Sequence, residues 1–344
     1  MKITVPQQLK ADMPQTTFGK ILSATPVVMA VVATMLAGLA SSEMTKAQYD
    51  RSLGAQQQSK AGDQWSFFQA KRLRGAVQEN TAELLGSICE LRPLEAGALR
   101  KAAGDWPAGV EAGEAGKLQA ELTAAVESAA GQEALKLLRE GRVPATVAGP
   151  TPDGRITAAL NGMENLAPDA EMAALLGQVD DRMIEKTLGE ARDRTQAFDA
   201  ATKPVNQAID RIDDLLTRRS ALLEGAAGAG ASTREGVGAG AGPSVRRDFT
   251  AARLRYAALR YEVEARLNQA IANLYELEVR KSNISAERHH TRSQRFFFGM
   301  LGAQFGVIIS TFALAARNRN LLWSLAAAAG LLAVLFAAYV YLYV

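Results

Sequence analysis

The two histidines of the chain, His289 and His290, are the first side chains to consider for acid–base or metal chemistry. Neighbouring residues on a helix point about 100° apart, so these rings cannot chelate one ion as an i, i+4 pair can. Arg288, Arg292 and Arg295 lie beside them in the sequence. A basic cluster of this kind favours contact with anionic lipid head groups at a membrane surface rather than catalysis.

Acidic pairs occur at Asp180–Asp181 and Asp213–Asp214, within segments that have the periodicity of amphipathic helices. No histidine lies near either pair in the sequence, so we expect both pairs to be solvated. Cys89 is the single cysteine, which excludes an intramolecular disulfide and a cysteine-based zinc site. Its neighbours are apolar, and we therefore expect Cys89 to be a small buried hydrophobe.

A glycine-rich run at 236–242 has the composition of a phosphate-binding loop. It lacks the Gly-Lys-Ser/Thr ending of such loops and follows no strand pattern, so it predicts a flexible linker. The sequence contains no Ser-His-Asp arrangement, metal-ligand spacing or dinucleotide motif. We therefore expect that the chain is not an enzyme and binds no cofactor or metal.

Charge and hydropathy indicate a membrane protein. Lys and Arg number 39 against 36 Asp and Glu, and this balance argues against nucleic-acid binding. Uncharged stretches cover 21–42, 296–316 and 321–344, each long enough to cross a bilayer and without a charged face. The sequence thus predicts an all-α membrane protein with one N-terminal transmembrane helix and a C-terminal hairpin of two, joined by the polar turn 317–320.

The first apolar stretch could instead be a cleaved signal peptide. Lys2, Lys10 and Lys20 form a basic leader, and small residues at 38–40 would permit cleavage. The stretch is longer than the roughly 7–15 apolar residues of a typical signal peptide, so we expect an uncleaved anchor.

Small and polar residues within the spans predict helix–helix contacts. Gly38 belongs to a ridge of small residues on the first span, and Gly302 and Gly306 are four residues apart on the second. Such spacing lets helix backbones approach closely in lipid, and Gln304 could donate a hydrogen bond to a neighbouring helix. The contacts could lie within one chain or between chains.

Two long amphipathic helices are expected between the first two spans, over 43–92 and 245–295. Their apolar stripes favour an antiparallel, coiled-coil-like hairpin between them. The stripe of the first comprises Trp65, Phe68, Arg72, Ala76, Asn80, Leu84, Ile88 and Leu91, with Leu73, Val77 and Leu85 beside it; that of the second comprises Tyr256, Val263, Leu267, Ile271, Leu274, Leu277 and Ile284.

The remaining segments complete the expected organisation. Residues 1–20 form an N-terminal tail, 93–224 an Ala-rich helical insert with loops, and 225–244 a Gly/Ala-rich linker. Within the insert, 169–201 is expected to be helical, and Pro204 is expected to begin a further helix.

A stretch after the first span resembles a bacterial membrane family catalogued as domain of unknown function 4337. Its signature matches Asp63, Trp65, Gln69, Ala70 and Lys71, and the C-terminal block around the second and third spans is similar in arrangement. The resemblance covers roughly the first 90 and last 60 residues and implies the three-span layout with a helical insert, but no activity. Because Trp65 lies on the apolar stripe, we expect the signature to serve packing.

The expected function is that of a membrane-anchored scaffold or interaction protein. Its partners would be the lipid bilayer and a second copy of itself or another membrane protein, without nucleic acid. A component of an oligomeric transport or channel assembly, and a membrane sensor, are the alternatives. We expect a multi-pass protein of the bacterial inner membrane. The short-loop form of the positive-inside rule places the central region outside the cytoplasm, whereas the raw count of basic residues favours the reverse.

Overall fold

The computed structural model describes residues 17–104, 106, 112–146, 152–229, 241–316 and 319–343. Within these ranges the chain is helical, with short connections and no strand. Most of the expected N-terminal tail, most of the glycine-rich run and the Arg317–Asn318 part of the polar turn lie outside the described residues.

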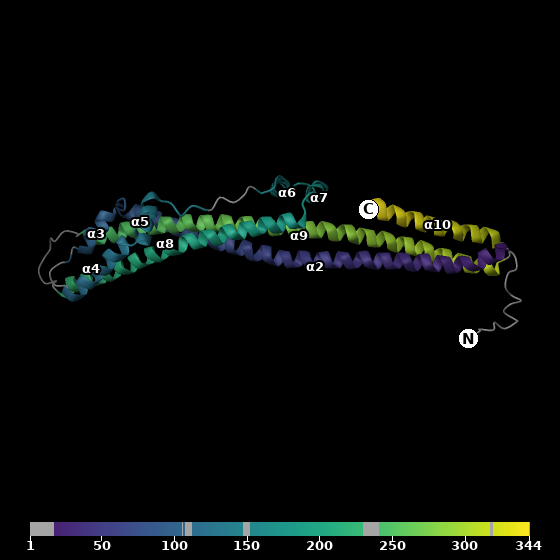
Figure 1. Ribbon diagram of the computed structural model, residues 1–344, viewed down its shortest axis with the longest axis horizontal. Helices are drawn as coiled ribbons and strands as arrows, with labels where there is room; N and C mark the ends of the chain where they lie inside the picture. The colour runs from purple at the N-terminus through teal and green to yellow at the C-terminus, as the bar shows by residue number, and fades with distance from the viewer. Residues whose placement is uncertain are drawn as a thin grey trace. The chain divides into compact units, whose positions relative to one another are not determined.

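Long helices dominate the described chain (Figure 1). The helices are α2 (Thr17–Ile88), α3 (Ala96–Gly104), α4 (Ala112–Glu127), α5 (Ala129–Glu140), α6 (Gly154–Glu164), α7 (Asp169–Leu176), α8 (Asp181–Ala229), α9 (Ala241–Ala315) and α10 (Arg319–Tyr343). Contacts divide the chain into two compact units. Unit 1 comprises Met1–Gln58 and Glu278–Val344, and unit 2 comprises Ser59–Leu277.

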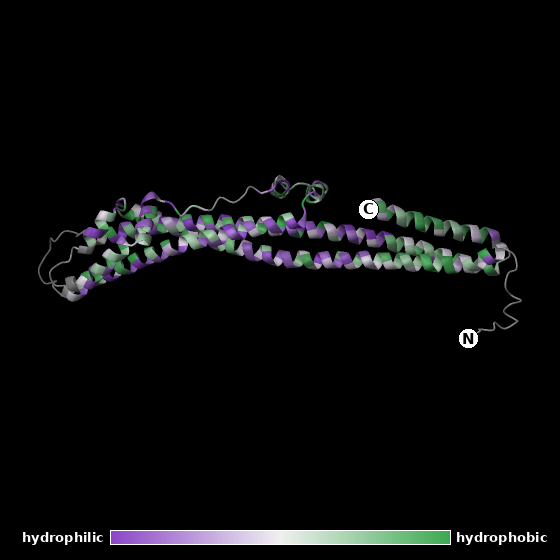
Figure 2. Cartoon of the chain, viewed as in Figure 1, coloured by the Kyte–Doolittle hydropathy of each residue, from purple (hydrophilic) through white to green (hydrophobic). Residues whose placement is uncertain are grey.

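Unit 1 contains the N-terminal part of α2, the C-terminal part of α9, and α10. Stretches of these three helices are long and apolar enough to cross a membrane, as the sequence predicted. Figure 2 shows the hydrophobic composition of α10 and of the N-terminal part of α2. A small core joins the three helices and consists of Ala33, Leu36, Ala40, Phe296, Ala303, Ala333 and Val340.

Gly306 lies where the helices of unit 1 pack closely, with room for little more than a Cβ. A Cβ there would lie 3.4 Å from the backbone oxygen of Ala326 on α10 and 3.5 Å from the sulfur of Met29 on α2. Gly302 also faces α10, whereas Gly38 has no neighbouring atom within 4 Å. Gln304 is exposed. A contact of Gly38 or Gln304 with a helix of another chain therefore stays a prediction.

Substitution of Gly306 by leucine is expected to lower the free energy of unfolding by about 1–3 kcal/mol, because the side chain would force α9 and α10 apart. The midpoint of thermal unfolding in detergent, followed by circular dichroism, measures the loss. Gly38→Leu is the matched control, since open space surrounds that position. Equal midpoints for the two variants would contradict the packing argument.

Unit 2 contains the C-terminal part of α2, helices α3 to α8, and the N-terminal part of α9. Helices α3, α4 and α5 pack together against α8, and α8 also contacts α9 through Arg253, which donates to Asp213 at 2.7 Å. The core of this unit is apolar and includes Leu99, Leu122, Val126, Leu138, Val205, Ile209, Ile212, Leu215, Val245, Phe249 and Tyr256.

Residues 169–201 are helical, as expected, apart from the break at 177–180 between α7 and α8. The expected start of a further helix at Pro204 is wrong, because α8 continues through that residue. Proline removes one backbone hydrogen bond from a helix interior. Its cost is offset because the apolar face of α8 is buried on both sides of it, at Phe198, Val205 and Ile209. The helix therefore stays continuous.

The linker predicted at 225–244 is helical at both ends. Helix α8 extends to Ala229, and α9 begins at Ala241. Alanine is the strongest helix former, and its abundance beside the glycines explains why the long helices continue into this stretch. The interval 230–240 lies outside the described residues.

Helices α2 and α9 run antiparallel within each unit. In unit 1, Asp50 meets Ser285 and Glu43 meets His289. In unit 2, Trp65 meets Glu276, and the backbone carbonyl of Glu90 accepts from Arg247. In both units the partner on α9 moves toward the N-terminus as the chain advances along α2.

The side of α2 that is buried within each unit follows a seven-residue repeat, and we call it the inner face. One series is small in all but one case and recurs at Ala33, Ala40, Ala47, Gly54, Ala61, Phe68, Gly75, Ala82 and, just after the end of α2, Cys89. A second series, mainly polar, recurs at Met29, Leu36, Glu43, Asp50, Gln57, Gln64, Lys71, Gln78 and Leu85. All are buried or partly buried. A seven-residue repeat keeps one face of a helix toward its partner, and small side chains let the two backbones approach.

The apolar stripe predicted for α2 is largely not the buried one. Leu73, Val77, Leu84 and Ile88 are 68%, 52%, 60% and 71% exposed. Hydropathy selected these residues, whereas α9 packs on the small and polar residues of the inner face. The stripe predicted for α9 is buried or partly buried throughout, because α9 has packing partners on more than one side in unit 2.

Candidate functional site

A buried polar cluster joins α2 and α9 in unit 1, next to the apolar part of both helices. Glu43 is 9% exposed, and its Oε2 lies 2.5 Å from Nδ1 of His289. Its Oε1 accepts from Lys46 at 2.7 Å. About two turns after Glu43 on α2, Asp50 accepts from the hydroxyl of Ser285 at 2.6 Å. Asp50 also lies 4.0 Å from Nε2 of His289.

This cluster contains the residue types of a hydrolytic triad in a different arrangement. In such a triad the histidine bonds the serine and acts as its base. Here the carboxylate of Asp50 bonds Ser285 directly, and His289 bonds Glu43. The arrangement therefore fixes the register of two helices and does not activate a nucleophile.

The carboxyl of Glu43 has a lowered pKa. Burial alone would raise its pKa, but the hydrogen bonds and charges of Lys46 and His289 together outweigh that effect, so the pKa falls below the ordinary 4.5. A carboxyl with a lowered folded-state pKa stabilises the fold above its ordinary pKa, and this contribution is lost as the pH falls through the lowered value.

Glu43→Gln is expected to lower the free energy of unfolding by about 1–3 kcal/mol at neutral pH, because a charge-assisted hydrogen bond is lost. The variant and the wild-type chain should converge as the pH falls through the lowered pKa. Thermal unfolding in detergent at several pH values measures both effects. Glu287→Gln is the control, since its pair with Arg51 spans 3.9 Å and is exposed. A constant difference at all pH values would refute the assignment.

The predicted head-group residues separate into two groups. The side chain of His289 is only 21% exposed and points into the cluster with Glu43, and its contact with a lipid head group stays a prediction. His290 lies 2.9 Å from Gln294 through its Nε2. Arg288 is exposed, whereas Arg292 and Arg295 are partly buried. Contact of Arg288 and its neighbours with lipid stays a prediction.

Two residues of the family signature attach α2 to α9 in unit 2. The indole of Trp65 donates to Oε1 of Glu276 at 2.6 Å and packs edge-on against Phe68. Lys71 forms an ion pair with Glu264 and lies over the ring of Tyr261. Both residues thus serve polar interactions as well as packing.

The pair of Lys71 and Glu264 belongs to a network that reaches three helices. Arg260, one turn before Glu264 on α9, also contacts its carboxylate at 3.4 Å. Burial and the nearby charge of Glu264 raise the pKa of Asp199 on α8, although Lys71 and Arg260 oppose the increase. Glu264 is 7% exposed, and Lys71 and Arg260 both contact its carboxylate.

The other signature residues, Asp63, Gln69 and Ala70, are exposed. Ala70 begins a second seven-residue repeat on the side of α2 that faces away from α9. We call this set the outer face; it comprises Ala70, Leu73, Val77, Asn80, Leu84, Ser87 and Ile88, all exposed. Such a spacing of apolar residues is the pattern by which one helix pairs with another.

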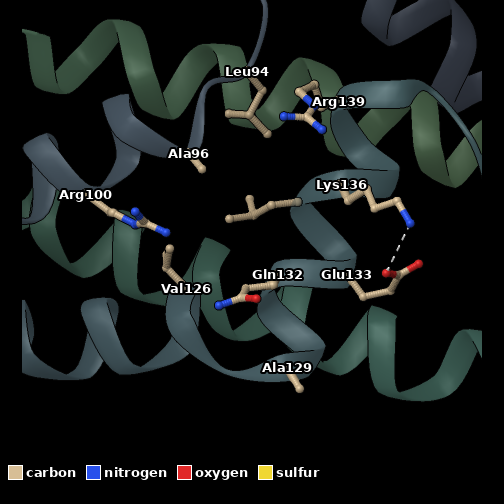
Figure 3. Close-up of a pocket in the computed structure, with 10 residues that line it drawn as sticks. Leu94, Ala96, Arg100, Val126, Ala129, Gln132, Glu133, Lys136 and Arg139 are labelled. Carbon is tan, nitrogen blue, oxygen red and sulfur yellow. Dashed lines mark ion pairs between the residues drawn. The ribbon is translucent and has the colours of Figure 1, made fainter.

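A hollow of about 500 Å³ lies among α3, α4 and α5 in unit 2 (Figure 3). Its floor includes Leu94 and Val126, and the basic side chains of Arg100, Lys136 and Arg139 surround it. Those three side chains are exposed, and Lys136 pairs with Glu133 at 3.7 Å. The hollow is therefore a solvated surface feature.

The carboxylates of the second acidic pair are held in ion pairs. Asp213 pairs with Arg253, and Asp214 pairs with Arg218 at 2.8 Å. Cys89 is a partly buried free thiol. Among the residues that the structure describes, no group of three His, Cys, Asp or Glu side chains could hold a metal ion.

Sequence reasoning missed Glu43 and Asp50, the carboxylates that hold His289 and Ser285. A signal was present, because the two acids are seven residues apart on a long helix. That spacing places them on one face of α2. Pairing them with His289 required the register between α2 and α9, which lies about 240 residues further along the chain.

Comparison with known proteins supports the resemblance noted above. Residues 18–136 match the family described as domain of unknown function (DUF4337), a range that contains the signature and most of α2. The matched range does not include the C-terminal block. No curated protein and no solved structure matches the chain.

Proposed function

We propose that this chain is an integral membrane protein, anchored by three spans, that acts as a scaffold and presents the outer face of α2 as an interaction surface. Its partners are the lipid bilayer and a second protein, either another copy of the chain or a different membrane protein. We further propose that it is neither an enzyme nor a nucleic-acid-binding protein.

The membrane anchor rests on the three apolar helices of unit 1. Large side chains on them are exposed, including Val28, Met35, Phe305, Phe312 and Leu332 at 57–66%. Water would make so many exposed apolar residues unfavourable, whereas hydrocarbon accommodates them. The Tyr339–Tyr343 ring pair at the end of α10 fits the interfacial position that tyrosine prefers.

The scaffold role rests on one observation, the exposure of Leu73, Val77, Leu84 and Ile88 on α2. Ala70 begins this face about 28 residues after the apolar stretch ends at Ser42, and charged residues such as Asp50 and Lys60 lie between them. This face is therefore not part of the membrane span. An apolar face outside the bilayer indicates contact with protein.

Transport is less well supported by the arrangement in the spans. A substrate path requires polar or ionisable groups that point into a shared interior. Gln304 is exposed instead, and the buried hydroxyl of Ser310 donates to Val307 of its own helix. We therefore favour a scaffold function over a transport function.

The association state of the full chain in detergent tests the proposal. We expect the wild-type protein to elute with more than the mass of one chain, and Leu73→Ser combined with Leu84→Ser to return it to that mass. Leu166→Ser is the control, because Leu166 is 81% exposed but lies between α6 and α7. A wild-type protein of single-chain mass, with no partner recovered by cross-linking in intact membranes, would exclude a scaffold.

A further inference from the structure

We infer that the outer face of α2 pairs with the outer face of a second copy of the chain, in parallel and in register. The inference rests on the proposed function and specifies its partner. The inner face of α2 is occupied by α9 at Trp65, Lys71 and Gly75. A second partner can therefore reach α2 only from the side of Leu73 and Leu84.

The spacing of the outer face suits a parallel helix pair. Ala70, Val77 and Leu84 are seven residues apart, and Leu73, Asn80 and Ser87 form the interleaved series. These two series are the a and d positions of a heptad repeat. The face is exposed at every one of the six positions. It thus has the geometry of one half of a two-helix interface.

Asn80 explains why the pairing would be in register. A polar residue within an apolar helix interface is satisfied when it meets its own counterpart, and this sets the alignment at a cost in stability. In that register the flanking residues bring no like charges together. Arg74 meets Gln69 of the other copy, and Glu83 meets Ile88.

The membrane explains why the pairing would be parallel and why a short interface suffices. Copies of one chain insert in the same orientation, so their α2 helices leave the bilayer in the same direction. Fewer than three heptads would associate weakly in free solution. Confinement of the anchors to one bilayer raises the effective concentration of each face for the other.

Site-specific disulfide formation in native membranes tests the inference. The background is the full chain with Cys89→Ala, in which two differently tagged copies are expressed together. Val77→Cys places a thiol in the centre of the outer face, and Glu79→Cys places one at an exposed position outside it. Oxidation should yield roughly tenfold more dimer containing both tags for Val77→Cys than for Glu79→Cys.

Two further variants keep the result interpretable. Asn80→Cys should also cross-link to itself, as an in-register pair requires, and Leu84→Ser should reduce the cross-link at Val77→Cys. Equal dimer at Val77→Cys and Glu79→Cys would overturn the inference. If Val77→Cys instead forms a disulfide with a different protein, identified by its mass, the inference is overturned. The scaffold proposal would still stand.

Discussion

Truncation of Phe249 to alanine is expected to lower the free energy of unfolding of unit 2 by about 3–5 kcal/mol. The side chain is fully buried where α9 meets the core that α3, α4, α5 and α8 build. Its removal loses the transfer free energy of the ring and leaves a cavity that long, constrained helices close only in part. A loss of this size is a large share of the roughly 5–15 kcal/mol that stabilises a typical protein.

Chemical unfolding of the full chain in detergent, with Trp65 and Trp323 replaced by phenylalanine in every variant compared, measures the effect through the fluorescence of Trp106. This residue packs against the same core and lies near Arg219. Phe67→Ala is the matched control, because Phe67 is 55% exposed on α2 in the same unit. We expect less than about 1 kcal/mol from the control. A similar shift in both variants would mean that Phe249 does not lie in a packed core.

Part of this fold could be predicted from the sequence. Uncharged stretches of more than 20 residues identified the three apolar helices, since their hydropathy needs no knowledge of packing. The stripe of α9 was also predicted correctly, because Ile271, Leu274 and Leu277 are both apolar and buried. Local composition and periodicity carry this information directly.

The inner face of α2 was not predictable in the same way. Ala47, Gly54 and Ala61 are small, and Gln57 and Gln64 are polar, so a hydropathy pattern gives them no weight. Their burial depends on the close approach of α9. The register that joins Glu43 to His289 is a property of two helices and cannot be read from either one alone.

On the two faces of α2, burial does not follow hydropathy. Leu73 and Val77 were expected to face α9 because burial usually follows hydropathy. The structure buries the small face and leaves the apolar one exposed. The outer face therefore indicates a binding surface, because an apolar repeat that the fold leaves exposed is available for a partner.

The second large effect is expected at the ion pair of Lys71 and Glu264. Glu264→Gln should lower the free energy of unfolding by about 2–4 kcal/mol, because the partly buried Lys71 would keep its charge without its partner. The estimate is below that for a fully buried pair, since the side chain of Lys71 is 29% exposed. Glu262→Gln, which breaks an exposed pair with Arg266, is the control.

The pKa of Asp199 should show how much of its increase comes from the charge of Glu264 rather than from burial. Its pKa is raised by burial and by the charge of Glu264, so the uncharged carboxyl is favoured in the folded chain, and this group gains stability as the pH falls through its raised pKa. Glu264→Gln removes the neighbouring negative charge and should bring the pKa of Asp199 down. Unfolding measured across pH should then show a weaker gain on acidification in the variant.

A charge exchange distinguishes the ion pair from a purely steric role for these side chains. Lys71→Glu alone should be more destabilising than Glu264→Gln, because it places two carboxylates together. Adding Glu264→Lys should restore part of the loss, since the pair is re-formed with its charges reversed, although Arg260 then faces a cation. A double-mutant cycle measures the coupling between the two sites. Zero coupling would show that the contact of α2 with α9 in unit 2 rests on the shape of the inner face alone.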